Sequence, residues 1–119
     1  MGDLSKHFSR SEFACKDGCG RDTIDAETLR VLEALRQHFG VPVKINSGYR
    51  CANRNKAVGG AAGSQHLYGR AADVTVEGVG PDSVAQHLQT TYPGKYGIGA
   101  YRTFTHIDTR SGLPVRWSG

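Results

Sequence analysis

The chain has 119 residues, of which 38% are hydrophobic and 22% are charged. This composition is that of an ordinary globular protein and excludes an intrinsically disordered chain. The length predicts one domain over residues 1–119, with its core over about residues 4–117. The 16 glycines are about twice the usual share, so we expect several tight turns or close backbone approaches.

The formal net charge of +4 says little by itself about partners. No run of five basic residues occurs, and the aromatic residues do not alternate with basic ones, so we expect no nucleic-acid partner. No apolar run of 18 residues occurs, which predicts no membrane insertion. Residues Met1–Phe13 carry charges and lack the apolar stretch of a secretory signal, so we expect synthesis in the cytoplasm.

The chain has three cysteines, Cys15, Cys19 and Cys51, and an odd number cannot form a complete set of disulfides. The spacing of Cys15 and Cys19 falls within that of zinc ligands, but no second close pair completes such a site. We expect three thiols, with a single disulfide among them as the alternative.

The first half of the chain predicts one long helix and one strand. Residues Phe8–Phe13 are typical of a short helix or a turn. Apolar residues then recur at helical spacing between Asp25, a good N-cap, and Gly40, a natural helix stop. The β-branched run Val41–Ile45 follows and predicts a strand.

The second half alternates short strands with one helix, and its last strands are close enough in sequence for a hairpin. This order predicts an α+β fold with a small, mostly antiparallel sheet. The polar, glycine-rich segment Asn53–Ser64 is expected to be a long functional loop. The remaining elements are expected over Ala71–Val76 (strand), about Asp82–Thr91 (helix), Gly97–Tyr101 and Phe104–Asp108 (strands), and Val115–Trp117 (edge strand or packed tail).

The residues that carry chemistry centre on Asp73, an acidic residue inside a predicted strand. A buried carboxylate must be paired, hydrogen-bonded or bound to a metal. His66 precedes it by seven residues, and His106 lies in another predicted strand, so both imidazoles are candidate co-ligands. Two imidazoles and one carboxylate are normal zinc ligands, and three protein ligands leave one position open, as in catalytic zinc sites. By spacing alone, a chance arrangement remains the alternative.

A longer, ordered pattern surrounds these residues. It comprises Ser47-Gly48-Tyr49-Arg50, Asn55 and Val58-Gly59-Gly60; then Ser64, His66, Gly69, Ala71 and Asp73; and lastly Gly97-Ile98-Gly99, His106 and Asp108. The pattern resembles the family of zinc D-Ala-D-Ala carboxypeptidases and endopeptidases, closest to its short single-domain branch. The segment Phe8–Phe13 fits the same branch, and the similarity runs from about Leu4 to Trp117. The family's fold is also similar to the zinc domain of hedgehog signalling proteins.

The resemblance implies that His66, Asp73 and His106 are the first, second and third zinc ligands. It implies that Arg50 holds the substrate carbonyl oxygen, where negative charge grows during attack. A surface ion pair is the structural alternative for Arg50. Ser64 matches a serine that touches the substrate backbone, with a turn-forming hydroxyl as the alternative.

The general base is the point at which this chain departs from the family. Many members have an acidic residue three positions before the third ligand, and here that residue is Thr103. Asp108 is the nearest acid and is predicted either to act as the base or to orient a ligand. A salt bridge to Arg110 is a third reading of Asp108, and Glu77 is a more distant candidate base.

The resemblance therefore implies a zinc peptidase acting on peptidoglycan stem peptides or cross-links, as a D,D-carboxypeptidase or endopeptidase. Nitrogen ligands favour zinc over manganese or cobalt. We expect a monomer that acts at the cell wall after release, such as a phage or prophage lysis enzyme. The alternative is a non-catalytic zinc-binding module of hedgehog-like fold, which the presence of Thr103 keeps open.

Overall fold

The computed structural model describes residues 4–15, 24–58 and 64–119 of the chain. None of the helices in these ranges has the length and hydropathy needed to cross a bilayer. The elements, in chain order, are η1 (Arg10–Phe13), α1 (Ala26–Phe39), β1 (Val43–Ser47), α2 (Ala52–Ala57), η2 (Gln65–Tyr68), β2 (Ala71–Val76), α3 (Pro81–Thr91), β3 (Gly97–Ala100), β4 (Thr105–Asp108) and β5 (Val115–Ser118), where η marks a 3₁₀-helix.

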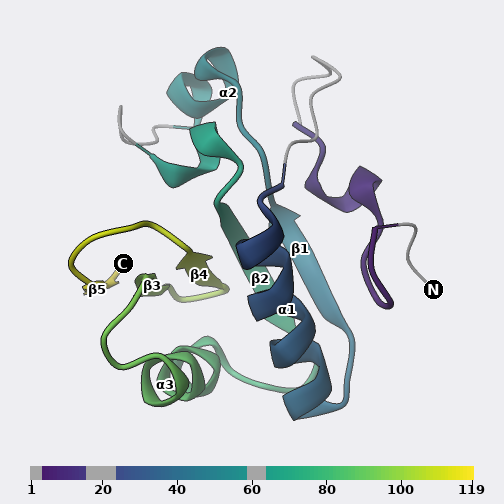
Figure 1. Ribbon diagram of the computed structural model, residues 1–119, viewed down its shortest axis with the longest axis vertical. Coiled ribbons are helices and arrows are strands. Elements are labelled where there is room, and N and C mark those ends of the chain that lie inside the picture. Colours follow the sequence, from purple (N-terminus) through teal and green to yellow (C-terminus); the bar gives the residue numbers. More distant parts are fainter. Residues whose placement is uncertain (1–3, 16–23, 59–63) are drawn as a thin grey trace.

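The strands form one five-stranded sheet in the order β1-β2-β4-β3-β5. The pairs β1–β2, β2–β4 and β4–β3 are antiparallel, and only the edge strand β5 runs parallel to its neighbour β3. The predicted α+β class with a mostly antiparallel sheet is therefore confirmed. Of the two predictions for Val115–Trp117, the edge strand is the one observed (Figure 1).

Helix α1 begins and ends where the sequence predicts. The Asp25 carboxylate accepts a hydrogen bond from the Glu27 N–H at 3.3 Å, which satisfies one of the unpaired donors of the first turn. Gly40 ends the helix with a φ of 68°, a left-handed conformation that costs glycine little. Helix α3 begins with Pro81 in its first turn, where a missing N–H leaves no intrahelical bond unmade.

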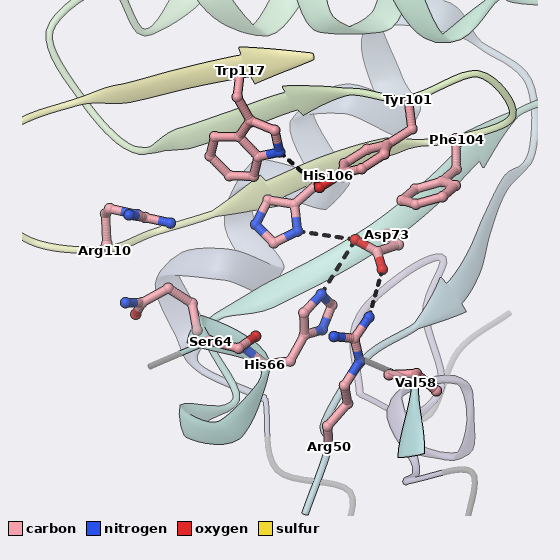
Figure 2. A pocket seen from close by; sticks show the side chains of 11 residues that line it. Arg50, Val58, Ser64, His66, Asp73, Tyr101, Phe104, His106, Arg110 and Trp117 are labelled. Atoms are coloured by element: carbon pink, nitrogen blue, oxygen red, sulfur yellow. Dashed lines mark hydrogen bonds and ion pairs between the residues drawn. The ribbon is translucent and has the colours of Figure 1, made fainter. Parts of the chain in front are cut away.

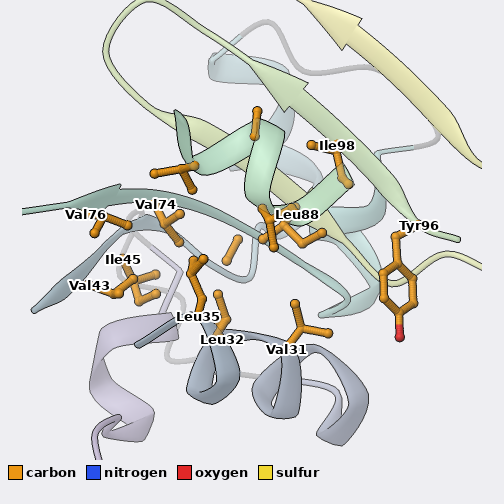
Figure 3. Packing of buried hydrophobic residues seen from close by; sticks show 14 of the residues in the cluster. Val31, Leu32, Leu35, Val43, Ile45, Val74, Val76, Leu88, Tyr96 and Ile98 are labelled. Atoms are coloured by element: carbon orange, nitrogen blue, oxygen red, sulfur yellow. The ribbon is translucent and has the colours of Figure 1, made fainter. Parts of the chain in front are cut away.

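Alternation along the strands divides the sheet into an apolar and a polar face. Helices α1 and α3 pack on the apolar face, where Val74, Ile98 and Ile107 are at most 1% exposed (Figure 3). Burying each such side chain stabilises the fold by about 1.5–3 kcal/mol. Neighbouring residues on the same strands must project from the opposite face. That opposite face, called the site face from here on, carries Asp73 and His106.

Two short helical segments were not expected from the sequence. Residues Asn53–Ser64 were predicted to form a loop, and this is wrong for the first part, because α2 covers Ala52–Ala57. The segment is polar, so it lacks the apolar spacing that reveals a helix. Residues 59–63 of that predicted loop lie outside the described residues. The second unexpected segment is η2, which follows Ser64 directly.

The N-terminal segment is joined to the Arg50 region by a cysteine contact. The Sγ atoms of Cys15 and Cys51 lie 3.6 Å apart, and the Cys51 N–H donates to the Cys15 sulfur at 3.4 Å. No disulfide joins these two residues in the structure. Cys19 lies outside the described residues.

Candidate metal centre

One row of residues crosses all five strands on the site face. The strand register aligns Ser47 with Asp73, Asp73 with His106, His106 with Gly99, and Gly99 with Trp117. Adjacent strands lie about 4.8 Å apart, so the side chains of Asp73 and His106 are direct neighbours. The sheet thus brings together two of the three predicted ligands, which are 33 positions apart in the chain.

The third predicted ligand, His66, is held by the turn η2. The Ser64 hydroxyl accepts from the His66 N–H at 3.3 Å, and Gly69 ends the turn with a φ of 71°. The ring is only 2% exposed, and its Nδ1 lies 2.7 Å from the Gly48 carbonyl oxygen. Since a carbonyl only accepts, Nδ1 carries the hydrogen and the neutral ring has its lone pair at Nε2.

Similar reasoning applies to His106. Both of its ring nitrogens face a carboxylate oxygen, and a neutral ring donates through only one of them. We assign the hydrogen to Nε2, which makes the shorter contact, 2.7 Å to Asp108 Oδ2, and the lone pair to Nδ1. Nδ1 of His106 lies 3.0 Å from Asp73 Oδ1, and Nε2 of His66 lies 3.2 Å from the same oxygen. Two lone pairs therefore face one carboxylate oxygen (Figure 2).

This convergence is the observation that tests whether a metal ion fits. Three electron-pair donors so close together need positive charge between them, which protons or a metal ion can supply. The ligand atoms of His66, Asp73 and His106 lie within 4.8 Å of one another, and all three residues are buried. Two imidazole nitrogens and one carboxylate oxygen make a donor set that suits zinc.

The electrostatics of the described residues agree with such a site. Burial acts to raise the pKa of Asp73, but hydrogen bonds and charge from His106 and His66 outweigh it and hold that pKa well below its usual value. Burial acts to lower the pKa of His106, but hydrogen bonds to Asp108 and Asp73 outweigh it and raise that pKa. The pocket thus keeps Asp73 ionised and favours positive charge beside it.

Asp108 lies behind His106, away from the cavity. It is 0% exposed, and its carboxylate accepts from the Gly97 N–H at 3.1 Å and from Arg110 Nε and Nη2 at 2.8 and 2.7 Å. Burial acts to raise the pKa of Asp108, but Arg110 and His106 outweigh it and hold the pKa well below its usual value. Asp108 thus makes both the contact with His106 that an orienting role needs and the salt bridge to Arg110.

Arg50 reaches the centre from the turn after β1. Its Nη2 lies 3.1 Å from Asp73 Oδ2, and its Nε and Nη1 donate to Ser47 Oγ and Asn55 Oδ1 at 3.2 and 3.4 Å. The turn itself is fixed by Gly48, where an added Cβ would lie 2.7 Å from the Phe13 Cα. The side chain is 16% exposed, so Arg50 is not in a surface ion pair.

A cavity of about 380 Å³ opens above these residues. Of the residues named from the sequence, Arg50, Ser64 and the three candidate ligands line it, whereas Asp108, Thr103 and Glu77 do not. Among the described residues, Asp73 is the one carboxylate in its lining. One side of the cavity is an aromatic wall that was not predicted from the sequence, made by Tyr101, Phe104 and Trp117 (Figure 2).

Only the alternation of residues along the last strands could have indicated this wall. Trp117 cannot be placed over His106 without the register of β5 against β3, which no local pattern predicts. Arg110, which also lines the cavity, was considered only as a partner of Asp108.

Comparison with known proteins bears directly on this site. A model of the family Peptidase M15 matches residues 6–108, which include every candidate ligand. The chain belongs to this family. It is also 40% identical over 85 residues to the zinc D-Ala-D-Ala carboxypeptidase of Streptomyces albus G, in an alignment that covers 67% of this chain and 33% of that protein. The chain thus spans about a third of the length of that relative.

Membership of the M15 family confirms the resemblance drawn from the sequence motifs. The matched residues end at 108, so β5 and its Trp117 lie beyond the part that the family model describes. The aromatic wall therefore combines two residues within the matched range with one outside it.

Proposed function

We propose that the chain is a zinc-dependent peptidase that hydrolyses stem peptides or cross-links of peptidoglycan, as a D,D-carboxypeptidase or endopeptidase. The convergence of His66, Asp73 and His106 in the lining of an open cavity carries this proposal. Membership of a peptidase family and the likeness to a zinc D-Ala-D-Ala carboxypeptidase support it.

The three candidate ligands would hold the metal through His66 Nε2, His106 Nδ1 and a carboxylate oxygen of Asp73. Zinc supplies a Lewis acid that polarises a peptide carbonyl and makes water more acidic. Hydrogen bonds from His66 to the Gly48 carbonyl and from His106 to Asp108 keep both lone pairs aimed at the centre.

Arg50 is proposed to bind the oxygen of the scissile carbonyl. A guanidinium has five N–H groups, and Ser47, Asn55 and Asp73 each accept one bond from Arg50. N–H groups therefore remain for a substrate on the cavity side. Because the side chain is already fixed, it stabilises growing negative charge without reorganisation.

Ser64 is proposed to bind the substrate backbone. Its oxygen accepts from the His66 N–H, which leaves its own hydrogen available to a carbonyl of the peptide. The hydroxyl thus caps the turn that presents His66 while the residue also lines the cavity. The two roles considered for Ser64 from the sequence, a contact with the substrate backbone and a turn-forming hydroxyl, are therefore compatible.

For Asp108 we propose the orienting role instead of the role of general base. Its two oxygens accept from His106, Gly97 and Arg110, and it has no exposed surface from which to take a proton from water. Its contact with His106 Nε2 fixes the tautomer and the ring plane of that ligand.

A non-catalytic zinc-binding module is the second candidate. It is favoured by one observation: among the described residues, Asp73 is the one carboxylate that lines the cavity. Such a module would bind zinc and a peptide with the same residues and release no product. A digestion experiment separates it from the peptidase.

The test is digestion of purified peptidoglycan by zinc-loaded protein, with products identified by mass spectrometry. We expect release of D-Ala or loss of cross-links, abolished by a chelator and restored by zinc. Arg50→Lys should lower the rate about 100-fold, whereas Arg54→Lys, a matched change on α2 outside the cavity, should not. Binding of one zinc ion without release of any product would instead support the non-catalytic zinc-binding module.

The site of action and the assembly state are also proposed. We infer that the protein acts at the cell wall, where its net charge of +4 favours adsorption to anionic wall polymer. We infer a monomer, because residues of one chain supply all three candidate ligands and the lining of the cavity. Binding to whole sacculi at rising salt and light scattering in solution test these two inferences.

A further inference from the structure

The aromatic wall of the cavity is built from one stacked pair and one indole. The rings of Tyr101 and Phe104 stack with centroids 4.5 Å apart and an interplanar angle of 11°. The Trp117 ring lies with its centroid 5.0 Å from that of His106. Figure 2 shows the Tyr101 hydroxyl and the Trp117 indole meeting beside the His106 ring.

The hydrogen bond between these two residues has a fixed direction. Trp117 Nε1 lies 2.7 Å from the Tyr101 hydroxyl oxygen. An indole N–H only donates, so the Tyr101 oxygen must accept and its own hydrogen points elsewhere. Within residues 4–15, 24–58 and 64–119, the Tyr101 hydroxyl donates no hydrogen bond of its own. Since Tyr101 lines the cavity, its O–H is a donor available to whatever occupies that space.

Trp117 is held in place by contacts that leave its indole little freedom. An added Cβ on Gly99 would collide with the indole, so the ring rests directly on the backbone of β3. The guanidinium carbon of Arg110 lies 5.7 Å from the ring centroid, and Arg110 is itself bound to Asp108. A rigid donor fixes the orientation of the hydroxyl that accepts from it.

We propose that Tyr101 is a substrate-binding residue whose hydroxyl donates a hydrogen bond to an oxygen of the bound peptide, and that Trp117 is the positioning residue that orients it. The acceptor is a carboxylate or a carbonyl oxygen, the two oxygen types that a peptide presents. This inference rests on the proposed function, because it takes the occupant of the cavity to be a peptide.

The first test compares Tyr101→Phe with wild type on a peptide that ends in D-Ala-D-Ala. The variant keeps the stacked ring and loses only the donor. We expect kcat/KM to fall about tenfold, the size expected for one hydrogen bond, with unchanged zinc content and melting temperature. Loss in KM identifies a carboxylate bound in the ground state, and loss in kcat identifies the carbonyl oxygen that gains charge.

The matched control is Tyr68→Phe. Tyr68 is 57% exposed and does not line the cavity. It should keep wild-type kcat/KM. If Tyr101→Phe also keeps it, the proposal is wrong.

A second test needs no turnover. Trp117 is the one tryptophan of the chain, so a ¹⁵N-labelled sample gives a single indole N–H resonance. In zinc-loaded protein this resonance should shift when the peptide is added, because a Tyr101 hydroxyl that donates becomes a stronger acceptor. In Tyr101→Phe the resonance should move to the position of a non-bonded indole and respond less to the peptide.

Trp117→Phe tests the positioning role. It should lower kcat/KM by less than Tyr101→Phe does, and the double variant should be no worse than Tyr101→Phe alone. Additive losses would overturn the coupling.

Failure of the proposed function gives a different pattern. If wild type binds the peptide without cleaving it, the peptidase proposal fails, and the binding constant replaces kcat/KM. Tyr101→Phe should then bind about tenfold more weakly than Tyr68→Phe, and equal binding would reject the role of Tyr101. A wild type that neither cleaves nor binds the peptide overturns both proposals.

Discussion

Two glycines on β3 decide which side chains can reach the site face. An added Cβ on Gly97 would collide with the Asp108 carboxylate, and one on Gly99 would meet the Trp117 indole. Ile98 between them points into the core and is 0% exposed. The strand therefore packs through one face and leaves the other as bare backbone, against which Asp108 and Trp117 lie.

Asp108→Asn separates the two roles predicted for this carboxylate. If Asp108 orients His106, we expect zinc affinity to fall about 10- to 100-fold, while turnover at saturating zinc is largely kept. Zinc affinity is measured by competition with a chromophoric chelator, and turnover is measured on the same peptide.

The control is Asp82→Asn, the same change at an exposed position of α3. It should leave both quantities unchanged. Unaltered zinc affinity combined with lost turnover in Asp108→Asn would mean that the residue is the general base after all. Unfolding by urea shows whether either variant is destabilised.

At the scale of elements, the N-terminal segment is attached to α1 through one carboxylate. Glu33 accepts from Ser5 Oγ at 2.5 Å, from the His7 N–H at 2.7 Å, and pairs with His7 Nδ1 at 2.7 Å. Burial acts to raise the pKa of Glu33, but the bonds from Ser5 and His7 outweigh it and lower the pKa below its ordinary value of 4.5. The segment that carries η1 is thus fixed electrostatically as well as by Phe8 and Phe13 in the core.

The contribution of the Glu33 charge to this attachment can be measured by comparing the stability of Glu33→Gln with that of wild type at several pH values. A carboxyl whose pKa is lowered on folding adds stability above its unfolded pKa and loses it as the pH falls through the folded value. We therefore expect the variant to be less stable than wild type by about 1–2 kcal/mol at pH 7. The difference should shrink below about pH 4.

Urea unfolding of both proteins at several pH values checks this expectation. A difference that stays constant from pH 7 to pH 3 would show that the carboxylate charge plays no part. The substitution would then act on stability only through packing.

The elements that could be predicted from the sequence are those whose buried residues recur at the spacing of a helix or a strand. Helix α1 shows apolar residues at helical spacing between a cap and a glycine stop, and β2 shows a β-branched run, because both bury a face against the core. The short α2 and η2 bury little apolar surface and are set by local turns, so no period reveals them. Strand β1 begins at Val43 instead of Val41, because Pro42 has no N–H to give to the sheet.

The candidate site was predictable in its residue types and not in its arrangement. Asp73 stood out because a carboxylate is disfavoured in a buried strand, and His66 and His106 followed as candidate co-ligands. The family resemblance supplied Arg50 and Ser64. His106 and Arg110 each lie two positions from Asp108, so the sequence could offer them as its partners, whereas its bond from Gly97 depends on the pairing of β3 with β4. The parallel pairing that brings Trp117 to His106 depends on long-range register. No spacing within one segment contains that information.

At the scale of the whole molecule, a bound zinc ion would connect η2, β2 and β4. A ligand that binds only the folded state stabilises it by about 2.7 kcal/mol at a concentration 100 times its dissociation constant. For a chain of this size we expect a melting temperature roughly 10 °C higher than that of the chelated protein.

Calorimetry with and without a chelator measures this shift. Asp73→Ala should abolish the dependence on zinc, because it removes the oxygen that faces both imidazoles. A shift that persists in this variant would place the stabilising ion elsewhere in the molecule.

The row of aligned residues that runs from Ser47 to Trp117 also means that the candidate ligands come together only when the strands pair in the correct register. Side chains alternate between faces, so a slip of β2 or β4 by one residue would turn Asp73 or His106 toward the core and bring an aliphatic neighbour to the surface. A chain with any such error keeps its composition and much of its secondary structure but loses its ligand set. The fraction of refolded protein that takes up one equivalent of zinc should therefore equal the fraction whose strands are correctly registered, which gives folding studies of this chain a stoichiometric readout.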